Sequence, residues 1–265
     1  MPTPVRIFFR WVFAVTWGVG LIGLLVPRVF SGAQSFSNVS PFYWLAAYAI
    51  SLTGIALTAF YDGRPGLRRL VNRLLPWRAR PHWYVIVLGG YALITLVALQ
   101  AGRWFGVAPA SLPALPGLLS GAVLTLVTDP GPLGEECGWR GFALPRLLES
   151  WSPIGASVLL GAIHAIWHVP LFFIPGLAQG NVFFPTFAVG VVSIAVITTW
   201  LYLRTGANLL LAILVHLLAN YCGGLLGSAA FSCFVAAQAT AALAIVVFGG
   251  LRSGPSVLPI KVKLD

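Results

Sequence analysis

Residues 129–148 read DPGPLGEECGWRGFALPRLL, and the rest of the chain is organised around this stretch. The 265 residues contain only three glutamates, and two of them, Glu135 and Glu136, stand side by side here. Arg140 follows them, and long apolar runs lie on both sides. Acidic side chains next to lipid are costly and usually functional. We therefore expect this pair to belong to a functional site.

The composition identifies the class of protein. The chain is 58% hydrophobic and 8% charged, with a mean hydropathy of +0.91, whereas a soluble domain carries about 25% charged residues. The apolar runs do not alternate in polarity as the strands of a membrane barrel would. Helices satisfy their own backbone polar groups in lipid. The sequence therefore predicts an all-α polytopic membrane protein of about eight transmembrane helices, at roughly 20 residues each.

The expected spans follow the apolar runs, and the site falls among the C-terminal ones. The runs lie near 11–27, 41–61, 83–99, 117–127, 153–174, 182–203, 207–226 and 229–251. The first run could also be a cleaved signal peptide, because Ser31–Ala33 offers small residues after it. Its seventeen apolar residues exceed a usual signal core and favour a retained span.

The charge of the chain indicates topology. The net charge is +10, and six of the sixteen basic residues fall in one expected loop: Arg64, Arg68, Arg69, Arg73, Arg78 and Arg80. Such a cluster is typical of a cytoplasmic loop, which can also touch anionic headgroups, and it does not indicate nucleic-acid binding. With eight spans, Arg6, Arg10, Arg140, Arg146, Arg204 and the basic tail share that side. Both termini are then expected in the cytoplasm.

The glutamate pair opens a helix. Two prolines and two glycines within residues 130–134 interrupt the apolar run, so we expect a new helix from about Leu133 to Leu148, with a bend at Pro145. Glu136 and Arg140 are four residues apart in the favourable order for a helical ion pair. Glu135 has no basic residue three or four positions on. Glu136 is therefore expected to be structural, and Glu135 is the candidate general base.

Histidines in two of the expected spans complete the candidate site. His164 and His168 are four residues apart, and so are His216 and Asn220. A carboxylate with one imidazole can activate a water, while a second imidazole and an amide can donate to an oxyanion. Alternatively, Glu135, His168 and His216 could hold a catalytic zinc.

Other catalytic signatures are missing or weak. The HExxH and GxSxG motifs are absent. The three cysteines form no disulfide framework, and Cys137 would need a histidine partner to serve as a nucleophile. His164 is open between taking part in the site and a hydrogen bond between helices. The expected boundaries also place Glu135, His216 and His168 at depths that differ by on the order of 10 Å.

Three motifs in order resemble a known family. They are EExxxR (Glu135, Glu136, Arg140), the string WHVPLF at Trp167–Phe172, and HxxxN (His216, Asn220). They are similar to the CPBP family, the CAAX prenyl endopeptidase and bacteriocin-processing or self-immunity group of intramembrane proteases, also called Abi. The string GPLGEECGWRGFALPRL resembles its bacterial branch. The resemblance covers the core at 115–227, after a variable N-terminal region at 1–100 and before a last span and basic tail at 228–265.

The resemblance implies a mechanism. Glu135 and His168 would activate water, His216 and Asn220 would form the oxyanion hole, and Glu136 with Arg140 would support the site. The family usually has an aromatic residue where this chain has His164, which adds weight to a role for that histidine and to the metal alternative. Members have been described both as metal-dependent enzymes and as metal-free glutamate proteases, so no cofactor is the default and zinc is the alternative.

The expected function is therefore an intramembrane endopeptidase of the bacterial cytoplasmic membrane. Its partners would be the lipid bilayer and a peptide or membrane-anchored protein substrate, without nucleic acid. Two alternatives stay open. One is a bacteriocin self-immunity or scaffold protein that needs no turnover. The other is a proton-coupled transporter that uses the buried carboxylates and histidines as a relay.

Overall fold

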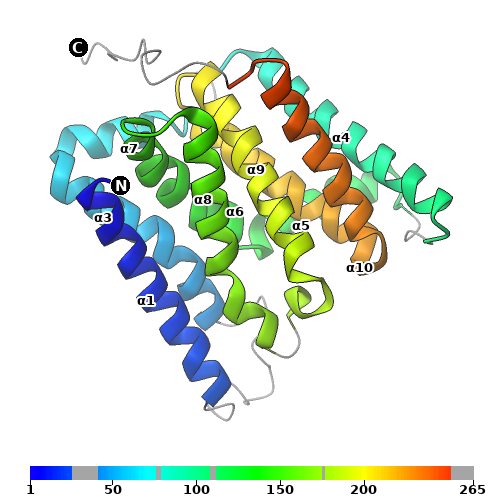
Figure 1. Ribbon diagram of the computed structural model, residues 1–265, viewed down its shortest axis with the longest axis horizontal. Helices are drawn as coiled ribbons and strands as arrows, with labels where there is room; N and C mark the ends of the chain where they lie inside the picture. Colours follow the sequence, from blue (N-terminus) through cyan, green and yellow to red (C-terminus); the bar gives the residue numbers. More distant parts are fainter. Residues whose placement is uncertain (26–40, 76–78, 108–111, 175–176, 252–265) are drawn as a thin grey trace.

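The computed structural model describes residues 1–25, 41–75, 79–107, 112–174 and 177–251, and within these ranges every regular element is a helix (Figure 1). The expected all-α fold is confirmed. The longer helices are α1 (Thr3–Leu25), α3 (Pro41–Asn72), α4 (Pro81–Trp104), α5 (Leu115–Thr128), α8 (Pro153–Trp167), α9 (Phe184–Arg204) and α10 (Leu209–Val247). The short elements are α6 (Gly131–Glu136), the π-helix η2 (Cys137–Ala143), α7 (Leu144–Leu148) and the 3-10 helices η3 (Val169–Phe173) and η4 (Ala178–Asn181).

The helices have the length and the surface of membrane spans. Among the described residues, six are long and apolar enough to cross a bilayer: α1, α3, α4, α8 continued by η3, α9 and α10. The shorter α5 is apolar as well. Large side chains such as Phe60, Leu93 and Trp104 are more than half exposed on the outside of the bundle, where lipid can cover them. The chain is therefore a polytopic membrane protein, and each of the eight apolar runs falls on one of these seven helices.

The last two runs share α10 because the chain breaks direction inside it. Gly227 has φ 68° and ψ 174°, which are not helical angles. Only glycine adopts this backbone region without steric cost. The segments before and after Gly227 are thus two helices in one continuous element, as two separate apolar runs in the sequence predicted.

The arginine-rich stretch corrects an expectation, because most of it is helical where a loop was expected. The helix α3 continues beyond Tyr61 to Asn72, with a break at Gly63 (φ 61°, ψ −159°). Pro65 lies in the first turn after this break, where its missing N–H costs nothing. In Figure 1 the cyan end of α3 turns away from its first part. Arg78, Ser31–Ala33 and the basic tail lie outside the described residues.

Two hydrophobic cores hold the bundle together. One joins α4, α9 and α10 through residues such as Tyr91, Leu201 and Phe234. The other joins α1, α3, η2, α7 and α8, with Trp139 and Phe142 at its centre. Residues 131–148, which carry Glu135 and Glu136 and are called the glutamate segment here, belong to the second core. His216 lies on α10 of the first core. The candidate site is therefore assembled from residues of both cores.

The first helix is part of the packing around the glutamate segment. Phe8 of α1 is fully buried and lies edge-on to Trp139, with ring centroids 5.6 Å apart. It also contacts Phe142 at 5.3 Å, and Phe9 approaches Trp139 at 6.2 Å. Aromatic pairs at these distances stabilise a core beyond their buried area. Helix α1 thus fixes the wall against which the glutamate segment rests.

Candidate active site

Residues 131–148 form one helical segment with an irregular middle. It begins at Gly131, two residues before the expected start, with Pro130 at its N-cap and Pro132 in its first turn. The π-turn of η2 follows Glu136, and the Leu144 N–H bonds to the Trp139 carbonyl five residues earlier. Pro145 lies directly after this turn, near the expected bend. Single π-turns inside helices often occur at functional sites, and this one separates the glutamates from the end of the segment.

A missing side chain lets α3 approach the glutamate segment closely. A Cβ atom at Gly138 would lie 2.5 Å from the carbonyl oxygen and the side chain of Ile50. The close contact keeps solvent away, and Glu135 and Glu136 are only 3% and 0% exposed. Buried carboxylates must be paired or hydrogen-bonded, so the partners of these two decide their roles.

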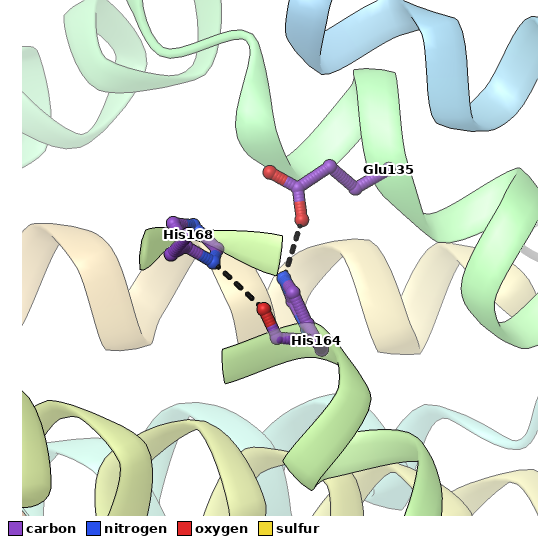
Figure 2. A group of neighbouring side chains, drawn as sticks. All are labelled: Glu135, His164 and His168. Atoms are coloured by element: carbon purple, nitrogen blue, oxygen red, sulfur yellow. Dashed lines mark hydrogen bonds and ion pairs between the residues drawn. The ribbon is translucent and has the colours of Figure 1, made fainter. Parts of the chain in front are cut away.

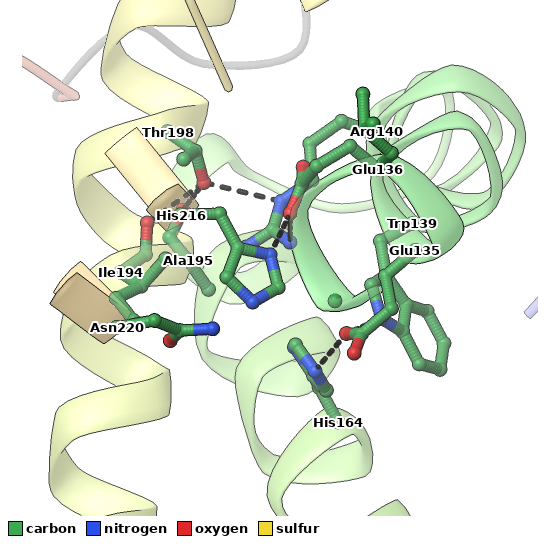
Figure 3. Close-up of polar contacts among 12 residues, drawn as sticks. Glu135, Glu136, Trp139, Arg140, His164, Ile194, Ala195, Thr198, His216 and Asn220 are labelled. Atoms are coloured by element: carbon green, nitrogen blue, oxygen red, sulfur yellow. Dashed lines mark hydrogen bonds and ion pairs between the residues drawn. The ribbon is translucent and has the colours of Figure 1, made fainter. Parts of the chain in front are cut away.

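Glu136 belongs to a buried network that links the two cores, although its own Oε2 and Arg140 Nη2 have no hydrogen-bond partner among the described residues. Its Oε1 accepts a hydrogen bond from Arg140 Nη1 at 2.8 Å and contacts His216 Nδ1 at 2.8 Å (Figure 3). Arg140, 1% exposed, donates through Nε to Thr198 Oγ1 on α9 at 3.1 Å. The ion pair expected from the i, i+4 spacing is confirmed. Glu136 is therefore a structural carboxylate that also orients His216.

Glu135 has different partners, and among the described residues it makes no ion pair with a lysine or arginine. Its Oε2 accepts a hydrogen bond from Trp139 Nε1 at 3.2 Å and lies 2.7 Å from His164 Nε2 (Figure 2). His168 Nδ1 is 3.1 Å from the His164 carbonyl oxygen. In the described part of the chain, neither ring nitrogen of buried His164 makes a well-aligned hydrogen bond. The contact at 2.7 Å is thus close but poorly directed, and the imidazole is available for a ligand.

The other carboxylate oxygen of Glu135, Oε1, lies on the side of His216 and Asp129. The position of a Cβ on Gly131 would be 3.3 Å from Glu135 Oε1, 3.3 Å from His216 Nε2 and 3.1 Å from Asp129 Oδ1. Gly131 has no such atom, so these three polar atoms border one small space. Glu135 therefore stands between two sets of groups, with His164 beside one oxygen and His216 near the other.

Asp129 is a site residue that the sequence reasoning missed. Its Oδ1 accepts a hydrogen bond from the Gly131 N–H at 2.9 Å, and its Oδ2 accepts one from Asn220 Nδ2 at 2.7 Å. An aspartate that accepts from the N–H two residues on, before a Pro-Gly pair, is a common turn device. That signal was present in the sequence Asp129-Pro130-Gly131, but it indicated only a turn. The contact with Asn220 depends on α10 and has no local signature.

The structure brings the predicted residues together despite their expected difference in depth. The ring centroids of His164 and His216 are 6.1 Å apart, and those of His164 and His168 are 5.0 Å apart. The reason is local: α6 begins right after the break at Pro130, and α8 ends at Trp167, so that His168 sits at its C-cap before the 3-10 turn around Pro170. Asn220 reaches the group through Asp129.

One set of side chains fits a metal ion. Donor atoms of Glu135, His164 and His168 all lie within 4.8 Å of one another. Two imidazoles and one carboxylate are a catalytic-zinc donor set, and the unpaired nitrogens of His164 are the donors that a metal would use. The set differs from the expected one by containing His164 in place of His216. The Nδ1 atom of His216 is hydrogen-bonded to Glu136 Oε1.

Cys137 is placed unfavourably for nucleophilic chemistry. Burial and the neighbouring negative charge of Glu136 raise the pKa of its thiol above the ordinary value. A thiol is reactive as the thiolate, which this environment disfavours. We interpret Cys137 as a packing residue.

Two comparisons with known proteins bear on this arrangement. Residues 116–222 match the model of a family described as Type II CAAX prenyl endopeptidase Rce1-like. The matched residues make up less than half of the chain. It is also 34% identical over 92 residues to CAAX prenyl protease 2 of Methanococcus maripaludis. That alignment covers 32% of this chain and 34% of the relative, so the chain spans about a third of the relative's length. The resemblance to this intramembrane protease family is thus confirmed.

Proposed function

We propose that this protein is an intramembrane endopeptidase in which Glu135 activates the attacking water. The observation that carries the proposal is the position of Glu135 between two sets of polar groups. One oxygen lies beside His164, and the other borders a small space shared with His216. The match of residues 116–222 to an endopeptidase family supports the same reaction class. A carboxylate within reach of a water and of an oxyanion donor is the minimum equipment for peptide hydrolysis.

The water-activating half of the site would consist of Glu135 and His168. Glu135 would take the proton from the water as the oxygen attacks the peptide carbonyl, and His168 would help to orient that water. His164 would hold the carboxylate in place, since its Nε2 lies 2.7 Å from Glu135 Oε2. The Trp139 N–H donated to the same oxygen fixes the carboxylate further. Peptide-bond cleavage then requires that the proton pass to the leaving amine, for which the protonated Glu135 is the nearest donor.

The oxyanion half would consist of His216 and Asn220. Glu136 holds Nδ1 of His216, so Nε2 is the atom presented to the substrate. Once protonated, this nitrogen can donate to the developing oxyanion. The Asn220 amide donates one hydrogen to Asp129 and keeps a second one for the substrate. Arg140 and Glu136 support this half by fixing the imidazole.

A metal alternative involves the same first half. Glu135, His164 and His168 would hold the ion. When bound, zinc would lower the pKa of its water and polarise the carbonyl. Ligands on a tetrahedral zinc are about 3.3 Å apart at these bond lengths. The 2.7 Å between Glu135 Oε2 and His164 Nε2 is shorter, so the two side chains would have to separate slightly.

The proposed substrate is a peptide or a membrane-anchored protein, cut near the surface of a bacterial cytoplasmic membrane. Basic residues in the arginine-rich stretch and at the N-terminus support cytoplasmic termini through the positive-inside rule. Arg140 gives no support to that orientation, because it is buried and paired with Glu136. The prenyl substrate in the relative's name belongs to that protein, and the class proposed here is defined only by an accessible peptide bond.

The test compares new peptide termini in host membranes that express the wild type or Glu135→Gln. The exchange keeps the shape of the side chain and its acceptor for the Trp139 N–H but removes the base. We expect termini that depend on wild-type protein, and a loss of turnover of about 10²–10⁴-fold in the variant. A thermal unfolding curve of both purified proteins controls for folding.

Identical terminal profiles with both proteins well expressed would argue against proteolysis. That result would favour the self-immunity or scaffold alternative. The transporter alternative has its own measurement: proton movement in liposomes that depends on Glu135 would support it, and its absence would remove it. The same liposomes, supplied with labelled membrane peptides, would report cleavage in parallel.

A further inference from the structure

A second polar feature lies on the far side of the glutamate segment and takes no part in the proposed chemistry. It is a cavity of about 240 Å³ between α3, on both sides of its break at Gly63, and residues of η2 and α7. Its charged lining consists of three arginines and two carboxylates: Arg69, Arg73, Arg146, Asp62 and Glu149. The rest of the lining is small or apolar, with Gly66 and Gly141 among it. We call this feature the arginine cavity.

The charges of the arginine cavity are not balanced internally. Arg146 is neutralised, because its Nη2 lies 2.6 Å from Asp62 Oδ2, and its guanidinium stacks on the Phe142 ring at 3.9 Å. Arg69 and Arg73 make no ion pair with a carboxylate in the ranges that the structure describes. Glu149 is exposed at the rim. Arg69 and Arg73 therefore line this space without an ion pair, and Glu149 at the rim is the remaining carboxylate of the lining.

The spacing of these two arginines favours a shared ligand. Arg69 lies in the last turn of α3, and Arg73 is the first residue after the helix. The Arg73 N–H still bonds to the Arg69 carbonyl at 3.2 Å, so the two side chains lie on the same face. Both are only partly exposed. The Arg73 guanidinium lies 5.9 Å from the centroid of the Tyr202 ring, which limits its freedom. Planar guanidinium groups bind phosphate oxygens through paired hydrogen bonds. Two such guanidinium groups bind a phosphate monoester or diester better than a single surface cation does.

We propose that the arginine cavity binds a phosphate group, carried by the headgroup of an anionic phospholipid. The cavity volume exceeds the size of a phosphate ion and leaves room for part of a glycerol. It is lined by the arginine-rich stretch, which the positive-inside rule assigns to the cytoplasmic side, where anionic lipids attract basic segments. Basic cavities between helices on that side are known lipid-binding features.

The cavity touches the segment that carries the glutamates. Gly141 forms part of its wall, and a Cβ at that position would lie 2.7 Å from Leu70 of α3. A headgroup held by Arg69 and Arg73 would therefore brace α3 against η2. Because a ligand that binds only the folded state adds to its stability, the same lipid should raise the unfolding temperature of the protein.

The test measures lipid binding by the full-length protein and needs no enzymatic activity. Native mass spectrometry in detergent would count phosphatidylglycerol molecules retained by the wild type and by Arg69→Gln/Arg73→Gln. A charge-assisted hydrogen bond contributes about 1.5–3 kcal/mol, so we expect retention to weaken at least ~10-fold. Phosphatidylcholine, whose headgroup carries a cation, should be retained weakly by both proteins.

A matched control is available on α1. Arg6 and Arg10 are also four residues apart, and both are exposed. Arg6→Gln/Arg10→Gln removes the same charge and should change phosphatidylglycerol retention less than ~2-fold. Equal losses in both double variants would show a diffuse surface effect and overturn the site. Unchanged retention in the Arg69/Arg73 variant would overturn it too.

Two further arms separate a folding defect and a free ion from the proposal. Glu149→Gln removes a negative charge at the rim, so it should tighten retention modestly, which a folding defect would not do. Inorganic phosphate at millimolar concentration should raise the unfolding temperature less than phosphatidylglycerol does. If phosphate alone gives the full effect, and the Arg69/Arg73 variant loses it, the lipid assignment is wrong.

Discussion

Glu135 and Glu136 are neighbours in the chain, yet they lie in two very different environments. Glu136 sits in an ion-paired network in which Arg140, His216 and Thr198 connect the two hydrophobic cores. Glu135 lies in a more open group, where His164 approaches without an aligned hydrogen bond and a small space separates it from His216. We propose that Glu136 mainly holds the structure and that Glu135 acts on the reacting molecule.

The difference shows how one helical turn divides structure from chemistry. Successive residues on a helix point about 100° apart, so the two adjacent glutamates have different hydrogen-bond partners, and His216 faces them with different ring nitrogens. Within the ranges that the structure describes, Glu136 is thus a buried carboxylate paired with Arg140, and Glu135 is a buried carboxylate without a lysine or arginine partner. We therefore expect the loss of the Glu136 charge to lower mainly the stability of the protein. The loss of the Glu135 charge should lower mainly its turnover.

The largest expected effect is on stability, from Glu136→Gln. The exchange leaves Arg140 buried without its counter-charge, and breaking a buried pair in this way costs about 3–5 kcal/mol. Glu135→Gln should cost less than about 1 kcal/mol, because the amide still accepts from Trp139. Unfolding of the purified proteins in mixed micelles measures both values.

The double variant Glu136→Gln/Arg140→Met serves as the control. It removes both charges, so it should recover a large part of the stability lost in the single variant. A Glu136→Gln protein as stable as Glu135→Gln would show that the network around Glu136 is not the structural half of the site.

The next effect concerns metal binding by Glu135, His164 and His168 in the water-activating half of the site. His164→Phe keeps an aromatic ring against Trp139, whose centroid lies 4.9 Å away, but removes a donor atom from the Glu135, His164 and His168 set. We expect the affinity for added Zn²⁺ to fall at least ~10-fold, as for the loss of a ligand or its support. Isothermal titration of the purified protein measures this without any assay of cleavage.

His216→Gln is the matched variant, because its amide can still donate to Glu136. Its zinc affinity should stay within ~2-fold of the wild type. A larger loss in His216→Gln than in His164→Phe would instead favour the Glu135, His168 and His216 set that spacing alone suggested. A wild type that binds no zinc would leave only the metal-free mechanism.

The fold was predictable to the extent that it depends on local signals. Long apolar runs predicted the helices, because lipid leaves the backbone no other way to satisfy its polar groups. The break at Pro130–Gly134 was also predictable, because prolines and glycines interrupt a helix. The arginine-rich stretch was not, since Gly63 allowed the chain to turn and start a second helical segment where charge suggested a loop.

The site divides in the same way. The ion pair of Glu136 with Arg140 follows from a spacing of four residues, and the structure confirms it. The contacts of Glu135 with His164 and of Asp129 with Asn220 join residues 29 and 91 positions apart, so no local pattern encodes them. Sequence reasoning left His164 open and passed over Asp129, because their partners are decided by how α8 and α10 pack.

A smaller effect is expected from Asp129, which contacts Asn220 in the proposed oxyanion half of the site. A carboxylate only accepts hydrogen bonds, so it obliges Asn220 to present its NH₂ group. Asp129→Asn offers one acceptor oxygen for two donors, the Gly131 N–H and the Asn220 amide. We expect turnover to fall about 10-fold with little change in KM, as for a group that positions a transition-state donor.

The effect should act through Asn220, which a double-mutant cycle can test. In an Asn220→Ala background, Asp129→Asn should lower turnover less than ~2-fold. Equal losses in both backgrounds would mean that Asp129 acts on something other than the amide. Side-chain amide resonances of protein labelled with ¹⁵N-asparagine would report the contact even in the absence of a substrate.

The smallest effect is expected at Cys137, directly after Glu136. Burial first, and the charge of Glu136 second, raise the pKa of its thiol, so the protonated form prevails near neutral pH. Alkylation by iodoacetamide should therefore be slow at pH 7 and increase only at a pH above that of an ordinary cysteine, whose pKa is about 8.5. Cys137→Ala should leave turnover within ~2-fold of the wild type, because the mechanism uses no thiolate. Mass spectrometry of the alkylated peptide gives the pH profile. Rapid labelling at neutral pH would place Cys137 in an open, electropositive setting, and would contradict the buried character assigned to the Glu136 side.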